Sequence, residues 1–174
     1  FQTAEKYDTY LLKHGYCGAF LIGLALQDEW MNQIKTTTMP TVLFDNCIDG
    51  NPNVCYLGTD SHEGIHMAVE HLYNLGHKKI AFINGSMYSL VSDHRQEAFE
   101  NSMKEFNLPL NKKLMARGYF VADSAKYHVP EFLEAGATAI VCGNDLLAQG
   151  VIEYCHSNGY KVPEDISVVG FDNI

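Results

Sequence analysis

The sequence predicts an α/β protein in which parallel β-sheet is covered by helices on both faces. Short apolar runs alternate along the chain with longer segments that carry the 3.6-residue periodicity of amphipathic helices. Runs such as Thr138–Cys142 are apolar at almost every position, as expected for strands that are buried on both faces. Strands that alternate with helices in this way are typical of parallel sheets.

The first part of the chain is predicted to alternate helices with short strands. A helix over Thr3–His14 places Tyr7 and Leu11 on one face, and Gly15 ends it. Residues 46–53 are rich in Asn, Asp, Gly and Pro, so this loop is the best candidate for a boundary between two lobes. The other elements expected here are a strand at Cys17–Ile22, a helix at Gln27–Lys35, and strands at Thr41–Phe44 and Val54–Leu57.

The rest of the chain repeats a rhythm of strand and helix. Gly76 and Gly159 directly follow helical segments, and glycine is favoured at helix C-termini. The chain begins in a helix and ends shortly after a strand, so we expect further sequence at both ends. The predicted helices span Ser61–Leu75, Ser92–Asn107, Ser124–Glu134 and Asp145–Asn158, and the predicted strands span Lys79–Ile83, Leu114–Phe120, Thr138–Cys142 and Ile166–Gly170.

The composition is that of an acidic globular domain. The sequence has 12 Lys+Arg against 21 Asp+Glu, a formal charge of -9, and is 47% hydrophobic. This negative balance argues against binding of nucleic acid or an anionic membrane by this stretch itself. The five cysteines form no C-x-x-C pair, which favours a reducing compartment and a cytoplasmic protein. A disulfide or metal role for Cys47 and Cys55 stays open as a minor alternative.

Polar residues follow the predicted strands, where open parallel sheets bind ligands. Asn144 and Asp145 could instead cap the helix that they precede, and Asp172 could cap a helix that follows. Phe120 could be a core residue or a ring on which a ligand stacks. The full set is Asp45, Asn46, Thr59, Asp60, Ser89–Arg95, Phe120, Asp123, Asn144, Asp145, Asp172 and Asn173.

Arg95 is the strongest candidate in this set. It lies one turn before Phe99 on the inward face of its predicted helix. A cation in the first turn opposes the helix dipole, so a buried arginine there needs an acceptor. A ligand or Asp172 could supply that acceptor. The alternative is a surface arginine that pairs with Asp93 or Glu97.

One motif suggests different chemistry. The run His62-Glu63-Gly64-Ile65-His66 matches H-E-x-x-H, in which two histidines on one helix face bind zinc. Gly64 weakens a helix at that point, and no third ligand has a defined spacing. Zinc hydrolysis through His62 and His66 is therefore a minor alternative, and we expect no metal.

The common cofactor and catalytic signatures are missing. The sequence contains no dinucleotide-binding G-x-G-x-x-G, no P-loop and no G-x-S-x-G elbow. No nucleophile and base can be picked out as a pair. We therefore expect no cofactor, no catalytic residues and no enzymatic activity.

Several longer stretches together resemble the LacI/GalR family of transcription regulators. The motifs follow the family's order and spacing and cover residues 40–174. Residues 1–39 match only in outline. The stretches that carry the resemblance are Gly58-Thr59-Asp60, His71–Ile83, Ser92–Arg95 with Phe99, Thr138–Asp145, and above all Gly159–Asn173.

The resemblance implies a fold and a set of site residues. The fold is two Rossmann-like lobes of the periplasmic-binding-protein type I, with residues 1–58 in the N-terminal lobe and 59–174 in the C-terminal lobe. Residue by residue, the positions that hydrogen-bond the effector match Arg95, Asn144 and Asp172. Phe120 matches the aromatic residue that stacks on the effector. Asp45 matches a carboxylate that the N-terminal lobe contributes to the cleft.

The resemblance also implies partners. A cytoplasmic homodimer would bind a small polar effector between its lobes and control operator DNA through a headpiece that is not in this chain. Ser89 and Val91 replace polar contacts that purine-binding members use, which favours a sugar or sugar phosphate, with a purine still open. No membrane partner is expected. A transport-linked sugar-binding protein of the same fold is the main alternative.

Overall fold

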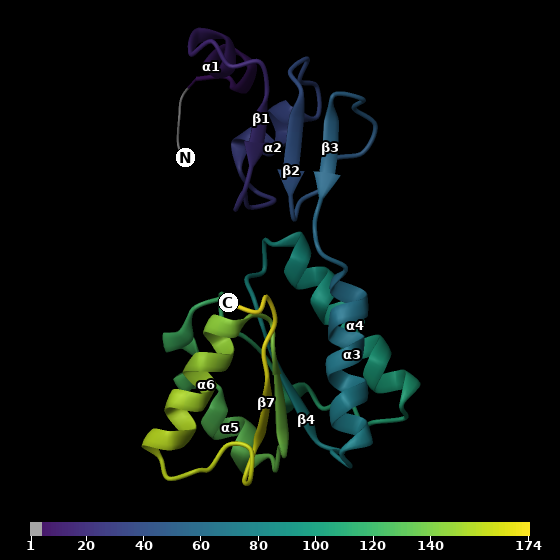
Figure 1. Cartoon of the computed structure of the whole chain (residues 1–174), viewed down its shortest axis with the longest axis vertical. Coiled ribbons are helices and arrows are strands. Elements are labelled where there is room, and N and C mark those ends of the chain that lie inside the picture. The colour runs from purple at the N-terminus through teal and green to yellow at the C-terminus, as the bar shows by residue number, and fades with distance from the viewer. Residues whose placement is uncertain (1–4) are drawn as a thin grey trace. The chain divides into compact units, whose positions relative to one another are not determined.

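The computed structural model describes residues 5–174 and divides into two compact units, each with its own sheet (Figure 1). The first unit comprises the residues up to Thr59 together with Tyr88–Val91, and the second comprises Asp60–Met87 and Ser92–Ile174. Thr3 and Ala4 of the first predicted helix lie outside the described residues. No helix among residues 5–174 is both long and apolar enough to cross a bilayer.

The first unit is a three-stranded parallel sheet with two short helices. The strands β1 (Ala19–Leu21), β2 (Thr41–Phe44) and β3 (Val54–Leu57) pair in that order. The helices are α1 (Tyr7–Lys13) and α2 (Glu29–Ile34). The fully buried core of this unit consists of Tyr7, Leu11, Met31, Ile34 and Leu43.

The pairing of β3 corrects one expectation. Thr41 of β2 lies in register with Val54 of β3, so both strands belong to one sheet. The loop at residues 46–53 therefore lies inside the first unit and is not the boundary that its composition suggested. The units divide after Thr59, beyond the end of β3.

The second unit is a four-stranded parallel sheet in the order β5-β4-β6-β7. The central strands are β4 (Ile80–Asn84) and β6 (Ala139–Cys142), and every residue of both is buried. The outer strands are β5 (Met115–Arg117) and β7 (Ser167–Val169). Because the chain crosses from β4 to β5 and back to β6, residues far apart in sequence meet at the carboxyl ends of the strands.

Alternate residues of the central strands pack against different helices. Phe82 and Val141 share a core with α3 (Ser61–Asn74) and α4 (Leu90–Glu105). Ile83 and Ile140 share a core with α5 (Val129–Glu134) and α6 (Asp145–Ser157). The two helix pairs lie on opposite sides of the second sheet in Figure 1. Because both faces of this sheet are covered by helices, its central strands are apolar at nearly every position in the sequence.

Two predicted elements differ from the structure between residues 112 and 134. The strand expected over Leu114–Phe120 is only β5, and a 3₁₀ helix, η1 (Lys112–Leu114), precedes it. The helix expected over Ser124–Glu134 is divided into a 3₁₀ helix, η2 (Ala122–Tyr127), and α5. Pro130 lies in the first turn of α5, and because proline has no backbone N–H, a continuous helix through this position would lose a hydrogen bond.

Candidate ligand-binding site

A buried arginine occupies the carboxyl-end edge of the second sheet. Arg95 projects from the second turn of α4 and is only 4% exposed. Its Nη1 donates to the carbonyl oxygen of Gly143, which follows β6. Its Nη2 lies 3.4 Å from Oδ1 of Asp172, which follows β7. The inward orientation expected of Arg95 is confirmed, and the surface arginine paired with Asp93 or Glu97 is not what the structure shows.

Two aromatic rings accompany this guanidinium. Its central carbon lies 3.9 Å from the ring centroid of Phe171 and 5.9 Å from that of Phe120. A guanidinium so close to an aromatic face is attracted by the ring quadrupole, more strongly where water is excluded. Phe171 was not among the sequence candidates, although it lies two residues after the end of β7 and the same rule that selected Asp172 applies to it.

Glycines make room for both rings. A Cβ on Gly85 would overlap the ring of Phe120, and a Cβ on Gly64 would overlap the ring of Phe171. Gly85 follows β4 directly, so the ring of Phe120 lies against the carboxyl end of the central strand. Phe120 itself lies in a turn with φ at +61°, outside the strand in which it was expected. In this turn Phe120 is half-buried and packs against the core between the second sheet, α5 and α6.

Asn144 connects this group to helix α6. Its side-chain oxygen accepts from the backbone N–H of Leu147 at 2.9 Å, which makes it the N-cap of the helix. Its amide nitrogen lies 3.4 Å from the carbonyl oxygen of Phe120. The capping alternative raised for Asn144 is therefore present in the structure. The cap holds the amide at the same edge as Arg95, because Gly143 directly precedes it.

The acidic candidates lie in different units. Asp172 has φ at +105°, and its side chain is 38% exposed, so it can accept further hydrogen bonds besides that from Arg95. Asp45 directly follows β2 in the first unit, with φ at +58° and its backbone N–H bonded to the carbonyl of Leu57. The structure thus brings together Arg95, Phe120, Asn144 and Asp172 in the second unit, while Asp45 belongs to the first.

This group of residues is suited to binding. The guanidinium is a planar donor, the carboxylate is an acceptor, and the ring of Phe120 offers an apolar face. Vicinal hydroxyls on a small ring match such a set. The neighbouring thiol of Cys142 is fully buried, and burial raises its pKa, so it stays protonated and unreactive.

The histidines of the H-E-x-x-H run lie elsewhere in the second unit, between α3 and α4. Nδ1 of His66 is 3.2 Å from Oγ of Ser102 and 3.8 Å from Oε2 of Glu105. The rings of His62 and His94 are 5.8 Å apart. Across residues 5–174, no three histidine, cysteine, aspartate or glutamate side chains come close enough to one another to hold a metal ion.

Comparison with known proteins gives a consistent result. The family described as a periplasmic binding protein-like domain matches residues 69–174. The NTD biosynthesis operon regulator NtdR of Bacillus subtilis (strain 168) is 32% identical over 165 residues, which are 94% of this chain and 50% of that protein. This chain therefore spans about half the length of that curated relative.

Two solved structures share the fold. A sugar-binding transcriptional regulator of the LacI family from Escherichia coli, complexed with phosphate, is 32% identical with a TM-score of 0.79, over 95% of this chain and 60% of that one. The lac repressor dimer bound to operator and the anti-inducer ONPF is 25% identical with a TM-score of 0.77, over 95% of this chain and 57% of that one.

Proposed function

Because this chain belongs to the LacI family of transcription regulators, through a periplasmic-binding-protein-like core, we propose that it is the effector-binding part of such a regulator. Its ligand is a small polar molecule of the sugar or sugar phosphate class, which the protein binds without transforming it. The observation that carries this proposal is the buried guanidinium of Arg95, held between Asp172, the carbonyl of Gly143 and the ring of Phe171.

The sugar class is supported by the chemistry of the site. Arg95 and Asp172 present a donor fork beside an acceptor, which suits two adjacent hydroxyls. Phe120 adds a partly exposed ring that can cover the apolar face of a pyranose. The E. coli relative is described as sugar-binding, and its complex holds phosphate, an anion that an arginine also binds well.

The regulatory step follows from family membership and is part of the proposal. Effector binding favours one arrangement of a homodimer over another, and this bias reaches operator DNA through a headpiece outside this chain. A cytoplasmic location fits that role. The lac repressor structure, a dimer on its operator, is the relative that supports this arrangement.

Thermal unfolding of the 174-residue chain with a panel of sugars, sugar phosphates and purines tests the proposal. A ligand at about 100 times its dissociation constant adds about 2.7 kcal/mol to the free energy of unfolding. For a chain of this size we expect a rise in Tm of roughly 5–10 °C. No shift with any of these compounds contradicts the proposed ligand class.

Two variants locate the ligand. Arg95→Lys keeps the charge but loses the planar fork, and Asp172→Asn loses the carboxylate. Each is expected to weaken binding of the active compound about tenfold or more, the loss typical of a charge-assisted hydrogen bond. Asp123→Asn is the matched control, since that carboxylate is 76% exposed and its ion pair is with the surface residue Lys126. Unchanged affinity in Asp172→Asn would show that the ligand binds elsewhere.

A further inference from the structure

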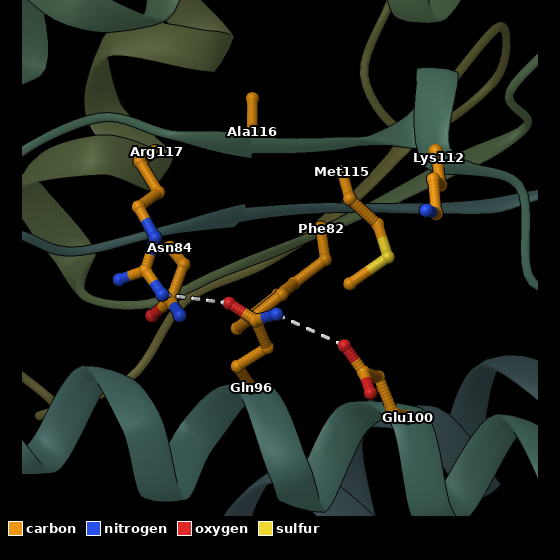
Figure 2. A pocket seen from close by; sticks show the side chains of 8 residues that line it. All are labelled: Phe82, Asn84, Gln96, Glu100, Lys112, Met115, Ala116 and Arg117. Carbon is orange, nitrogen blue, oxygen red and sulfur yellow. Dashed lines mark hydrogen bonds between the residues drawn. The ribbon is translucent and has the colours of Figure 1, made fainter. Parts of the chain in front are cut away.

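A second hollow lies in the same unit, away from the residues just described. It has a volume of about 390 Å³ and lies between helix α4 and the outer strand β5 (Figure 2). Pockets for small molecules start at about this size. Its floor is apolar, formed by Phe82 of β4 and Met115 of β5. None of Arg95, Phe120, Asn144 and Asp172 lines it.

Three polar side chains form a chain of hydrogen bonds that runs from Arg117 of β5 to Gln96 and Glu100 of α4. Arg117 donates from Nη2 to Oε1 of Gln96 at 2.9 Å, and Gln96 donates from Nε2 to Oε1 of Glu100 at 2.9 Å. Arg117 is fixed further by its bond to the carbonyl of Ser86 at 3.0 Å. With the amide of Gln96 held at both ends, the carboxylate of Glu100 keeps its second oxygen available for another donor.

Opposite charges face each other across this hollow. Figure 2 shows Lys112, from η1, on the wall opposite Glu100, with the side chain of Met115 between them. Neither Lys112 nor Glu100 forms an ion pair with any side chain among residues 5–174. Arg117, the other cation of the pocket, is paired with Asp93 at 3.6 Å. The pocket thus presents one cation and one anion without an ion-pair partner among the described residues, separated by an apolar floor.

We propose that this pocket binds an α-amino acid with a short aliphatic side chain. The ligand's carboxylate pairs with the ammonium of Lys112, and its ammonium donates to the carboxylate of Glu100. Its side chain lies on Phe82 and Met115. A zwitterion pairs with both Lys112 and Glu100, whereas a molecule with one charge leaves one of these two groups unpaired. The inference does not depend on the effector site around Arg95.

Calorimetric titration of the 174-residue chain with L-alanine, L-valine, L-leucine and L-methionine tests the proposal. We expect saturable binding of at least one of them, with Kd near or below about 1 mM. The best binder is then compared with its amide, which lacks the carboxylate, and with its des-amino acid, which lacks the ammonium. Each analogue is expected to bind at least about tenfold more weakly.

Variants assign the binding to this pocket. Glu100→Gln and Lys112→Met are each expected to weaken it about tenfold or more. Glu97→Gln on the exposed side of α4 and Lys113→Met within η1 are matched controls that leave it unchanged. The proposal is overturned by absence of saturable heat, by equal affinity for the analogues, or by unchanged affinity in both pocket variants. Binding that is lost only in Asp172→Asn places the amino acid at the effector site and also overturns it.

Discussion

At the scale of single residues, the candidate site depends on how a buried cation is satisfied. Burying a guanidinium without partners would be unfavourable. In this structure Arg95 contacts the carbonyl of Gly143, the carboxylate of Asp172 and the ring of Phe171. Asp172 is the partly exposed member of this set, so it is the partner that a ligand can share. Glycines at positions 64 and 85 let the two rings come this close.

Replacement of Gly85 tests this close approach. We expect Gly85→Ala to lower the free energy of unfolding by about 1–3 kcal/mol, because its methyl group would overlap the ring of Phe120. In a Phe120→Ala background the same change is expected to cost much less. Urea unfolding of the wild type, both single variants and the double variant measures the coupling. Strictly additive costs would show that the two residues do not interact.

At the scale of elements, helix α6 illustrates how packing overrides propensity. Its N-terminus is capped by Asn144, and its inner face packs on η2 and on β6. Gly150 lies in the helix interior, where glycine is normally unfavourable by about 1 kcal/mol relative to alanine. The reason for glycine is contact: a Cβ at this position would overlap the backbone carbonyl of Ala122 at the start of η2.

Substitution within α6 separates these two effects. Gly150→Ala is expected to reduce stability by about 1–3 kcal/mol, because the backbone of η2 must move. Helix propensity alone would predict a gain. Gln149→Ala, on the exposed face of the same helix, serves as the control and should change stability by less than about 0.5 kcal/mol. Chemical denaturation provides the comparison, and a Gly150→Ala variant as stable as the wild type would refute the packing explanation.

At the scale of the whole molecule, the two units differ in how their sheets are covered. In the second unit both faces of the sheet carry a buried core. In the first unit one face packs on α1 and α2, while Phe20 and Leu57 are each 51% exposed. The second unit also holds Arg95, Phe120, Asn144 and Asp172, so its central strands are the scaffold for these proposed site residues.

Hydrogen exchange should reveal this organisation. Amides of β4 and β6 are expected to exchange most slowly, because these strands are paired on both edges and buried on both faces. Amides of the outer strand β5 should exchange faster. Ile140→Ala, which removes a fully buried side chain, is expected to cost about 2–5 kcal/mol and to accelerate exchange in β4 and β6. Equal protection of β5 and β6 would contradict the expectation.

Much of the fold could be predicted because buried positions carry apolar residues, which recur along the sequence with the period of a helix or a strand. Strands β2 and β3 match their predicted bounds, and α3 and α6 are each one residue shorter than expected. Arg95 was placed on the inward face by its spacing from Phe99, and its burial confirms that position. The region from Leu114 to Glu134 was less predictable. The turn at Tyr119 and Phe120 ends the strand early, and Pro130 interrupts the helical pattern that follows.

Residue patterns alone predict a parallel α/β fold that places Arg95 and several acidic residues beyond its strands, and they leave open whether Arg95 is buried or exposed. Which of these groups contact one another follows from the tertiary structure. Arg95 and Asp172 are 77 residues apart in the chain, and they come together because β4, β6 and β7 are neighbours in the sheet. The ring of Phe171 beside Arg95 and the pocket between α4 and β5 have the same origin. Such contacts depend on strand order and register, and local periodicity carries no information about either.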